Sequence, residues 1–209
     1  MEAIEKELKY QINKTDYFKL MQYLDNNCIK CNSIIQTNYY IDDFNFTLNE
    51  NNITARIRKK SDEKYEFTLK IPINNISSLK SAAIKKEITI ELNNKIANNL
   101  IDNGIWNKKS IDILYSNIKF PVEFNKLKVI GSLTTERIFY KVKNISELLS
   151  IDKSTYFDIE DFEVEWETNE LDKCNDILLN VFNNINVNYI KSNSSKNTRF
   201  IKRLNEVII

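Results

Sequence analysis

The stretch Asp161–Glu167, DFEVEWE, decides the fold class of this chain. Three glutamates alternate there with three apolar residues, namely Glu163, Glu165 and Glu167 with Phe162, Val164 and Trp166. Because successive side chains of a β-strand point to opposite faces, this rhythm predicts a strand with one acidic face and one apolar face. The sequence also supplies helices that could cover the apolar face.

Other expected strands repeat this alternation with charges of both signs. The shared faces are Glu5, Glu7 and Lys9; Arg56 and Arg58, opposite Ala55 and Ile57; and Glu66, Thr68 and Lys70, opposite Phe67 and Leu69. Arg-x-Arg and Glu-x-Glu place like charges side by side, which does not favour strand stability. The pattern leaves two interpretations open: a sheet with one face in water, or a barrel with charges inside and helices outside. A charged interior would hold acidic residues for a metal and basic residues for an anion.

Short turns connect most of the expected elements, which predicts antiparallel pairing. Strands are expected at about 2–10, 34–42, 44–48, 53–60, 64–71, 84–92, 126–142, 145–152 and 155–167. Helices are expected after an N-cap at Thr15, with Phe18, Leu20, Met21 and Leu24 on the apolar face, and at about 94–102, 110–117, 171–184 and 194–206. Ser194 or Ser195 would cap the last helix, whose Phe200, Ile201 and Leu204 would dock outside the barrel. No internal repeat or linker divides the chain, so we expect a single domain over residues 1–209.

The composition excludes several classes of site. The chain has no histidine, which removes Ser-His-Asp and Cys-His catalysis and histidine-based zinc sites. Its two glycines, Gly104 and Gly131, are too few for a Rossmann fingerprint or a P-loop. Phosphate binding must therefore rely on Arg and Lys side chains. The formal net charge of +1 gives no reason to expect a nucleic acid or a membrane as partner.

The three cysteines indicate neither a redox centre nor a zinc site. Cys28 and Cys31 form a single C-x-x-C, which we interpret as chance thiols in a loop, and Cys174 stands apart. The sequence shows no signal peptide and no uncharged stretch long enough to span a bilayer. We therefore expect a soluble, cytoplasmic protein. Nothing in the sequence indicates its oligomeric state.

The charged motifs, taken in order, resemble those of CYTH domains, also called triphosphate tunnel metalloenzymes. Glu5–Lys9 has the opening E-x-E-x-K pattern of that family. The further matches are Gln36–Asp42 to Q-x-N-x-Y-F-D, Ala55–Arg58 to L-R-I-R, Phe67–Lys70 to L-T-L-K, Thr135–Arg137 to T-x-R, Ser150–Asp152 to the L-D strand, Asp161–Glu167 to D-F-E-L-E-Y-E, and Ser195–Arg199 to S-K-x-x-R. A single motif of this kind is weak, but the ordered set runs along nearly the whole chain.

This resemblance implies an α+β fold, mainly antiparallel, with an eight-stranded closed β-barrel and helices packed outside. It implies that Mg²⁺ or Mn²⁺ is held by five acidic residues, Glu5, Glu7, Asp152, Glu163 and Glu165. The phosphate path would be lined by Lys9, Arg56, Arg58, Lys70, Arg137, Lys196 and Arg199. Of these residues, Glu7, Lys9, Arg137 and Lys196 would take part in the reaction. Lys86-Glu87 departs from the usual Arg-x-Glu or Arg-Glu of the family, so Glu87 is the least secure member of the set.

The resemblance implies metal-dependent hydrolysis of a small triphosphate, with inorganic triphosphate as the first choice. Thiamine triphosphate comes second, because its ring would need a platform near Trp106 or Tyr39, and such aromatic residues are usually core. Class IV adenylate cyclases of the family share a His-Phe motif that a chain without histidine cannot contain, which disfavours cyclase activity without abolishing it. RNA triphosphatase activity, or a non-catalytic role in binding a nucleotide or polyphosphate, is also compatible with these residues.

Overall fold

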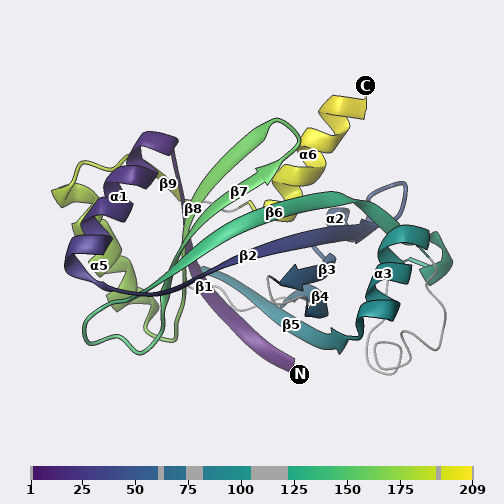
Figure 1. The fold of residues 1–209 in the computed structure, drawn as a ribbon, viewed down its shortest axis with the longest axis horizontal. Helices are drawn as coiled ribbons and strands as arrows, with labels where there is room; N and C mark the ends of the chain where they lie inside the picture. The colour runs from purple at the N-terminus through teal and green to yellow at the C-terminus, as the bar shows by residue number, and fades with distance from the viewer. Residues whose placement is uncertain (1, 61–63, 74–81, 105–121, 192–193, 209) are drawn as a thin grey trace.

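The computed structural model describes residues 2–60, 64–73, 82–104, 122–191 and 194–208 (Figure 1). Its strands are β1 (Glu2–Ile12), β2 (Ile29–Asp42), β3 (Thr54–Lys60), β4 (Tyr65–Pro72), β5 (Ala82–Leu92), β6 (Lys128–Lys141), β7 (Leu149–Tyr156), β8 (Ile159–Glu167) and β9 (Tyr189–Lys191). Its helices are α1 (Lys14–Asn27), α2 (Thr47–Glu50), α3 (Asn94–Asn103), α5 (Leu171–Asn184), α6 (Lys196–Ile208) and the 3₁₀ turn η1 (Phe124–Lys126). The expected helix at 110–117 and Trp106 lie outside the described residues.

The strands form one curved sheet in the order β5-β4-β3-β2-β6-β7-β8-β1-β9. All the pairings are antiparallel, as predicted. Partners directly opposite each other in such a ladder share a face, so the register brings charged residues of neighbouring strands together. Lys9 faces Glu165, Asp152 faces Glu163, and Arg137 faces Asp152.

The prediction of eight strands closed into a barrel is wrong. The sheet has nine strands, because β9 adds to β1 beside residues 10–12. The first strand of the order, β5, also pairs with β1, but only through Glu2–Leu8, whereas β8 pairs with Glu7–Ile12. Only Glu7 and Leu8 take part in both ladders, so β1 joins the two parts in a staggered way and not as one strand of a regular ring. The fold remains α+β and mainly antiparallel.

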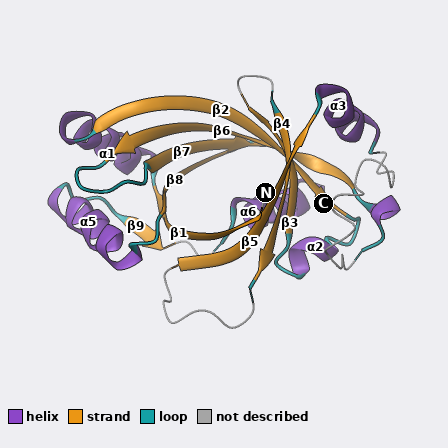
Figure 2. Ribbon diagram, turned by 90° about the horizontal axis from the view of Figure 1, so that it is seen from below, coloured by secondary structure: helices purple, strands orange, loops and turns teal. Residues whose placement is uncertain are grey.

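Helices cover the outer face of the sheet at its two ends (Figure 2). Helices α1 and α5 bury Leu20 and Phe182 against the apolar faces of β1 and β8, including Leu8, Val164 and Trp166. At the other end, α3 packs on the outer residues of β3, β4 and β5. The opposite face of the same strands carries the charged residues, as the alternation predicts.

Two local predictions, the start of the first helix and the strand at 44–48, are wrong because helix-capping side chains were not recognised in the sequence. Helix α1 begins two residues earlier than expected, since the N-cap is Asn13 and not Thr15; the Asn13 side chain accepts a hydrogen bond from the Asp16 N–H at 2.9 Å. The expected strand at 44–48 is partly the helix α2. Its first N–H groups donate to the carboxylates of Asp42 and Asp43, which stabilises a helical turn.

Helix α6 packs on the concave face of the sheet, so the prediction that it docks outside is wrong. Its predicted apolar residues Phe200, Ile201 and Leu204 are buried, and their partners include Tyr40 and Leu133. Tyr40 lines the interior cavity, and Leu133 pairs opposite Asn38, which lines it too. The predicted cap is confirmed, because the Ser195 hydroxyl accepts a hydrogen bond from the Thr198 N–H at 3.1 Å.

The C-x-x-C pair also lies differently from the expected loop. Cys28 is the C-cap of α1 and Cys31 lies in β2, exposed to solvent. Phe18, expected on the apolar face of α1, is 56% exposed, and Tyr17 is buried in its place.

Gly131 permits the docking of α6, which gives a stability prediction. Its φ is +147°, and a Cβ atom there would lie 2.6 Å from Cζ of Phe200. We expect Gly131→Ala to lower the free energy of unfolding in urea by about 1–3 kcal/mol, because Phe200 is buried and must shift. Gly104→Ala is the matched control, since its φ is +60° but its nearest neighbour is 3.9 Å away. Equal losses in the two variants would contradict a role for the Phe200 contact.

Candidate functional site

A cavity of about 300 Å³ lies on the concave face of the sheet. Its charged lining residues are Glu7, Lys9, Arg56, Arg58, Lys70, Lys85, Glu87, Arg137, Glu165, Glu167 and Lys196. Apart from Lys85 and Glu167, these are all residues predicted from the sequence. The cavity is therefore lined by both kinds of charge that the alternating pattern indicates.

Three carboxylates form a compact group at one side of the cavity. Asp152 on β7 and Glu163 and Glu165 on β8 are all buried, and one oxygen of each lies within 4.8 Å of the others. We call these three residues the carboxylate cluster. Glu165 lines the cavity, whereas Asp152 and Glu163 are not among its lining residues.

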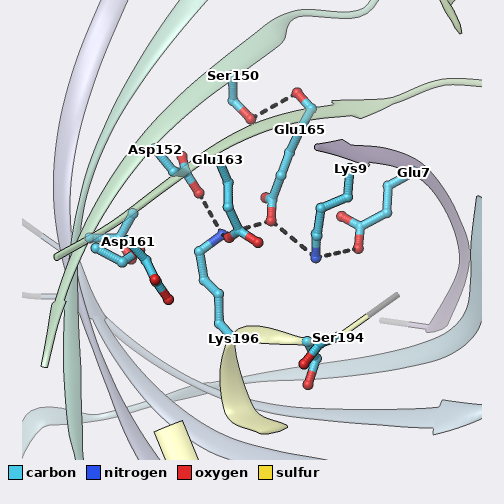
Figure 3. A network of polar contacts seen from close by, with 12 residues as sticks. Glu7, Lys9, Ser150, Asp152, Asp161, Glu163, Glu165, Ser194 and Lys196 are labelled. Atoms are coloured by element: carbon cyan, nitrogen blue, oxygen red, sulfur yellow. Dashed lines mark hydrogen bonds and ion pairs between the residues drawn. The ribbon is translucent and has the colours of Figure 1, made fainter. Parts of the chain in front are cut away.

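Among the described residues, four cations contact the carboxylate cluster: Lys196, Arg137, Lys9 and, through Glu163, Arg199. Figure 3 shows Lys196 and Lys9 beside it. The Lys196 ammonium lies 2.9 Å from Oδ2 of Asp152 and 2.7 Å from Oε1 of Glu165, and it also contacts Oε2 of Glu163. The Arg137 guanidinium donates two hydrogen bonds to Asp152, at 2.7 and 2.6 Å, and contacts Glu165. Lys9 bridges Glu7 and Glu165, at 2.8 and 3.1 Å. The cluster is thus neutralised by side chains from β1, β6 and α6.

These ion pairs favour the ionised forms of Glu165 and Asp152. Burial alone would raise the pKa of Glu165, but Lys196, Lys9 and Arg137 outweigh it and hold that pKa well below its usual range. The pKa of Asp152 is lowered in the same way, against burial, by Arg137 and Lys196. Burial opposes the charge of Lys196, yet the three carboxylates raise the pKa of its ammonium.

The opposite side of the cavity is basic. Arg56 and Arg58 on β3 share one face with each other, and Lys70 on β4 lies beside Glu87 on β5, at 3.0 Å between their charged atoms. Burial and the charges of Arg56 and Arg137 lower the pKa of Arg58 to about 9. Burial would raise the pKa of Glu87, but Lys70 and Arg56 lower it to about 2. In the sheet order, β2 and β6 separate these strands from β7 and β8.

Arg56 differs from the other buried cations. It is 9% exposed, and its Nε has no hydrogen-bond partner in the ranges that the structure describes. Within the described part of the chain, Arg56 forms no ion pair either, whereas Arg58 donates to Asn38 at 2.9 Å. The basic side therefore has a donor, Nε of Arg56, that meets no acceptor of the described residues.

A model of the CYTH domain family matches residues 3–201. This chain belongs to the CYTH family. No curated protein matches it in sequence at a significant level. Recognition of the family from the ordered motifs is therefore confirmed, and the match includes the predicted site residues.

Solved structures share the fold of this CYTH protein. One, from Hippeastrum, is a candidate adenylyl cyclase described as revealing a dominant triphosphatase activity; it is 18% identical over 95% of both chains, with a TM-score of 0.80. A second, a candidate adenylate cyclase from Bacillus halodurans, is 22% identical over 95% of this chain and 98% of that one, with a TM-score of 0.73. A third, from Pyrococcus horikoshii, is 14% identical over 97% and 99% of the two chains, with a TM-score of 0.58. At these identities the likeness establishes the fold alone.

Two of the site residues predicted for the CYTH domain are placed differently from the rest. Arg199 does not line the cavity; its guanidinium lies 2.8 Å from both Asp161 and Glu163 and donates to the Ser194 carbonyl at 2.9 Å. Glu5 pairs with Lys85 in the β1–β5 ladder, and its side chain is outside the described part of the structure.

Neutral polar residues of the CYTH cavity were missed in the sequence. They are Gln36, Asn38, Thr54, Thr135, Ser194, Ser195 and Asn197, together with the aromatic Tyr40. Alternation would have found several of them, because Gln36, Asn38 and Tyr40 are spaced by two along β2. Among the described residues, no helix is long and apolar enough to cross a membrane.

Proposed function

We propose that this CYTH protein hydrolyses a triphosphate with the help of Mg²⁺ or Mn²⁺, and that inorganic triphosphate is its substrate. The observation that carries the proposal is the buried Arg56, whose Nε has no hydrogen-bond partner among the described residues. A buried cation is costly unless an anion compensates it, so this side of the cavity fits a polyanionic ligand.

The other basic residues support the same ligand. The lowered pKa of Arg58 follows from burial beside Arg56 and Arg137, and a bound anion would relieve this repulsion. Guanidinium groups bind phosphate oxygens in a bidentate manner. Arg56, Arg58 and Lys70 would bind the phosphate chain, and Lys9, Arg137 and Lys196 would stabilise charge at the reacting phosphoryl group.

The carboxylate cluster fits a divalent ion. It offers buried oxygen ligands from three residues, which is the donor chemistry that Mg²⁺ and Mn²⁺ prefer. Asp152, Glu163 and Glu165 would hold the ion, with Glu7 and Glu5 as further ligands. A bound ion would neutralise phosphate charge and lower the pKa of an attacking water. Arg137 and Lys9 would keep Asp152 and Glu165 oriented for this role.

The lining of the cavity favours a compact substrate over one with an aromatic group. Tyr40 is the one aromatic residue among the described lining residues, and its ring packs against Phe200, with 5.1 Å between ring centroids. Tyr39 packs into the apolar core of the outer face. The described residues thus offer no free platform for stacking a thiamine ring or a base, which supports inorganic triphosphate. The triphosphatase activity described for the Hippeastrum protein supports hydrolysis as the reaction.

Substitution of the two arginines tests the binding part of this proposal. We expect Arg56→Ala and Arg58→Ala each to weaken binding of inorganic triphosphate by about 1.5–3 kcal/mol for each charged hydrogen bond lost. Lysine at either position should restore only part of the affinity, because it lacks the planar fork. Calorimetric titration of the folded variants with triphosphate measures this effect.

Arg203→Ala is the matched control for these titrations. Arg203 pairs with Asp158 and Glu206 on the exposed side of α6, away from the cavity. It should leave the affinity unchanged. Unchanged affinity in both Arg56→Ala and Arg58→Ala would show that the basic side does not bind the substrate.

A further inference from the structure

We infer that Lys196 and a divalent ion compete for the carboxylate cluster, so that binding of the ion releases the first turn of helix α6. This inference rests on the metal site of the proposed function. It concerns what this chain's own cation does when the ion binds.

The Lys196 ammonium occupies the centre of the carboxylate cluster. It contacts all three members, Asp152, Glu163 and Glu165. Each of the other cations described at the cluster reaches fewer of them: Lys9 contacts Glu165, Arg199 contacts Glu163, and Arg137 contacts Asp152 and Glu165. An ion held by all three carboxylates would need the position that the ammonium takes.

Distance and charge both indicate that the Lys196 ammonium and a divalent ion cannot occupy the carboxylate cluster at the same time. The ammonium nitrogen lies 2.7 and 2.9 Å from its nearest Glu165 and Asp152 oxygens, whereas Mg²⁺ binds oxygen at about 2.0–2.1 Å. Among the described residues, the ion pairs connect five carboxylates and four cations, so the group is close to neutral. Its members are Glu7, Asp152, Asp161, Glu163 and Glu165 with Lys9, Arg137, Lys196 and Arg199. A divalent ion added to this buried group leaves excess positive charge unless one cation departs.

Lys196 is the cation that can depart most easily. Lys9 and Arg137 lie within strands β1 and β6, which are paired on both sides. Lys196 is instead the first residue of α6, beside the Ser195 cap. The body of the helix is fixed independently by the buried Phe200, Ile201 and Leu204. Departure of the ammonium therefore disturbs the first turn and leaves the rest of α6 docked.

Release of Lys196 has a consequence for the substrate. Lys196 lines the cavity, so its freed ammonium stays next to the space that a polyanion would occupy. Binding of the ion thus presents one more positive charge to the phosphate chain. Binding of the ion is then expected to increase the affinity for triphosphate. Because linkage is reciprocal, triphosphate should increase the affinity for the ion by the same factor.

Binding of Mn²⁺ alone, measured by the loss of its free electron paramagnetic resonance signal, tests the competition. We expect Lys196→Met to bind Mn²⁺ at least about tenfold more tightly than the unmodified protein, because the internal competitor is gone. Lys202→Met is the matched control, since Lys202 lies exposed on the same helix and should leave the affinity unchanged. Equal or weaker binding in Lys196→Met would overturn the competition. If none of the three proteins binds Mn²⁺, the metal site fails, and with it the metal-dependent hydrolysis proposed above.

Hydrogen exchange of the unmodified protein provides a readout that needs no substitution. Addition of Mn²⁺ should accelerate exchange of the amides in the first turn of α6, such as those of Thr198 and Arg199, and leave Ile201 and Leu204 protected. In Lys196→Met, Mn²⁺ should produce no such acceleration. Unchanged or slower exchange of the first turn in the unmodified protein, with Mn²⁺ bound, would show that the ion and the ammonium do not exclude each other.

Discussion

Glu165→Gln is expected to abolish metal-dependent hydrolysis of triphosphate while the sheet still folds. The Glu165 carboxylate contacts Lys9, Arg137 and Lys196 and belongs to the carboxylate cluster. Loss of groups that only surround a metal ligand typically costs about 10–100-fold in activity, so loss of a ligand should cost about 100-fold or more. Phosphate release at limiting Mg²⁺ measures this effect, and circular dichroism checks the fold.

Glu160→Gln is the control for that substitution. Glu160 lies on the same strand, β8, but pairs with Lys14 and Lys153 on the exposed side. It should keep the full rate. A Glu165→Gln variant that also keeps the full rate at limiting metal would remove Glu165 from the site.

Arg137→Ala is expected to cause a large loss of stability, about 3–5 kcal/mol, because it breaks a buried ion pair and leaves Asp152 with Lys196 as its remaining cationic partner among the described residues. Its partner Asp152 is 0% exposed and receives two hydrogen bonds from the guanidinium. Urea denaturation measures the loss. Arg137→Lys should restore part of the stability, since a lysine keeps the charge but not the planar fork.

A double substitution separates the buried charge from other effects of Arg137→Ala. Combining Arg137→Ala with Asp152→Asn removes both charges, so the combined loss should be smaller than the sum of the two single losses. Losses that simply add, or a loss below about 1 kcal/mol for Arg137→Ala, would contradict the pairing as a source of stability.

Alternation along the strands predicted much of the site. The spacing by two placed Arg56 with Arg58, and Glu163 with Glu165, on shared faces, and the structure shows these residues on the concave side of the sheet. Alternation could not decide whether that face meets bulk water or a cavity, because both interpretations need the same local pattern. The ordered motifs of the CYTH family favoured the enclosed charges.

The remaining features depend on contacts between distant segments. The stagger of β1 between β5 and β8 is a matter of register, which the sequence of β1 alone does not encode. The position of α6 on the concave face depends on Gly131, whose missing side chain leaves room for Phe200. An apolar helix face predicts that α6 is buried, but it does not say against which face of the sheet.

The sequence also did not predict which charged residues form ion pairs with each other. Arg199 lies close to Lys196 in the chain, yet it turns to Asp161 and Glu163 instead of the cavity. Gln36 and Asn38 line the cavity but were not predicted as site residues. The prediction was based on charged side chains, and these two side chains are neutral amides. Asn38 nonetheless helps to position the basic side, because its side-chain oxygen accepts a hydrogen bond from Nε of Arg58 at 2.9 Å.

Phosphate release from inorganic triphosphate by the purified protein, with Mg²⁺, with Mn²⁺ and with a chelator, tests the proposed function most directly. The comparison substrates are thiamine triphosphate, ATP and a 5′-triphosphorylated RNA. The proposal predicts rapid release from inorganic triphosphate that requires the divalent ion, with slower release from the larger compounds. If the protein hydrolyses one of those compounds faster, the proposed reaction stands, but inorganic triphosphate is not its preferred substrate. Tight binding of triphosphate without phosphate release under any of these conditions would contradict hydrolysis and show a binding module.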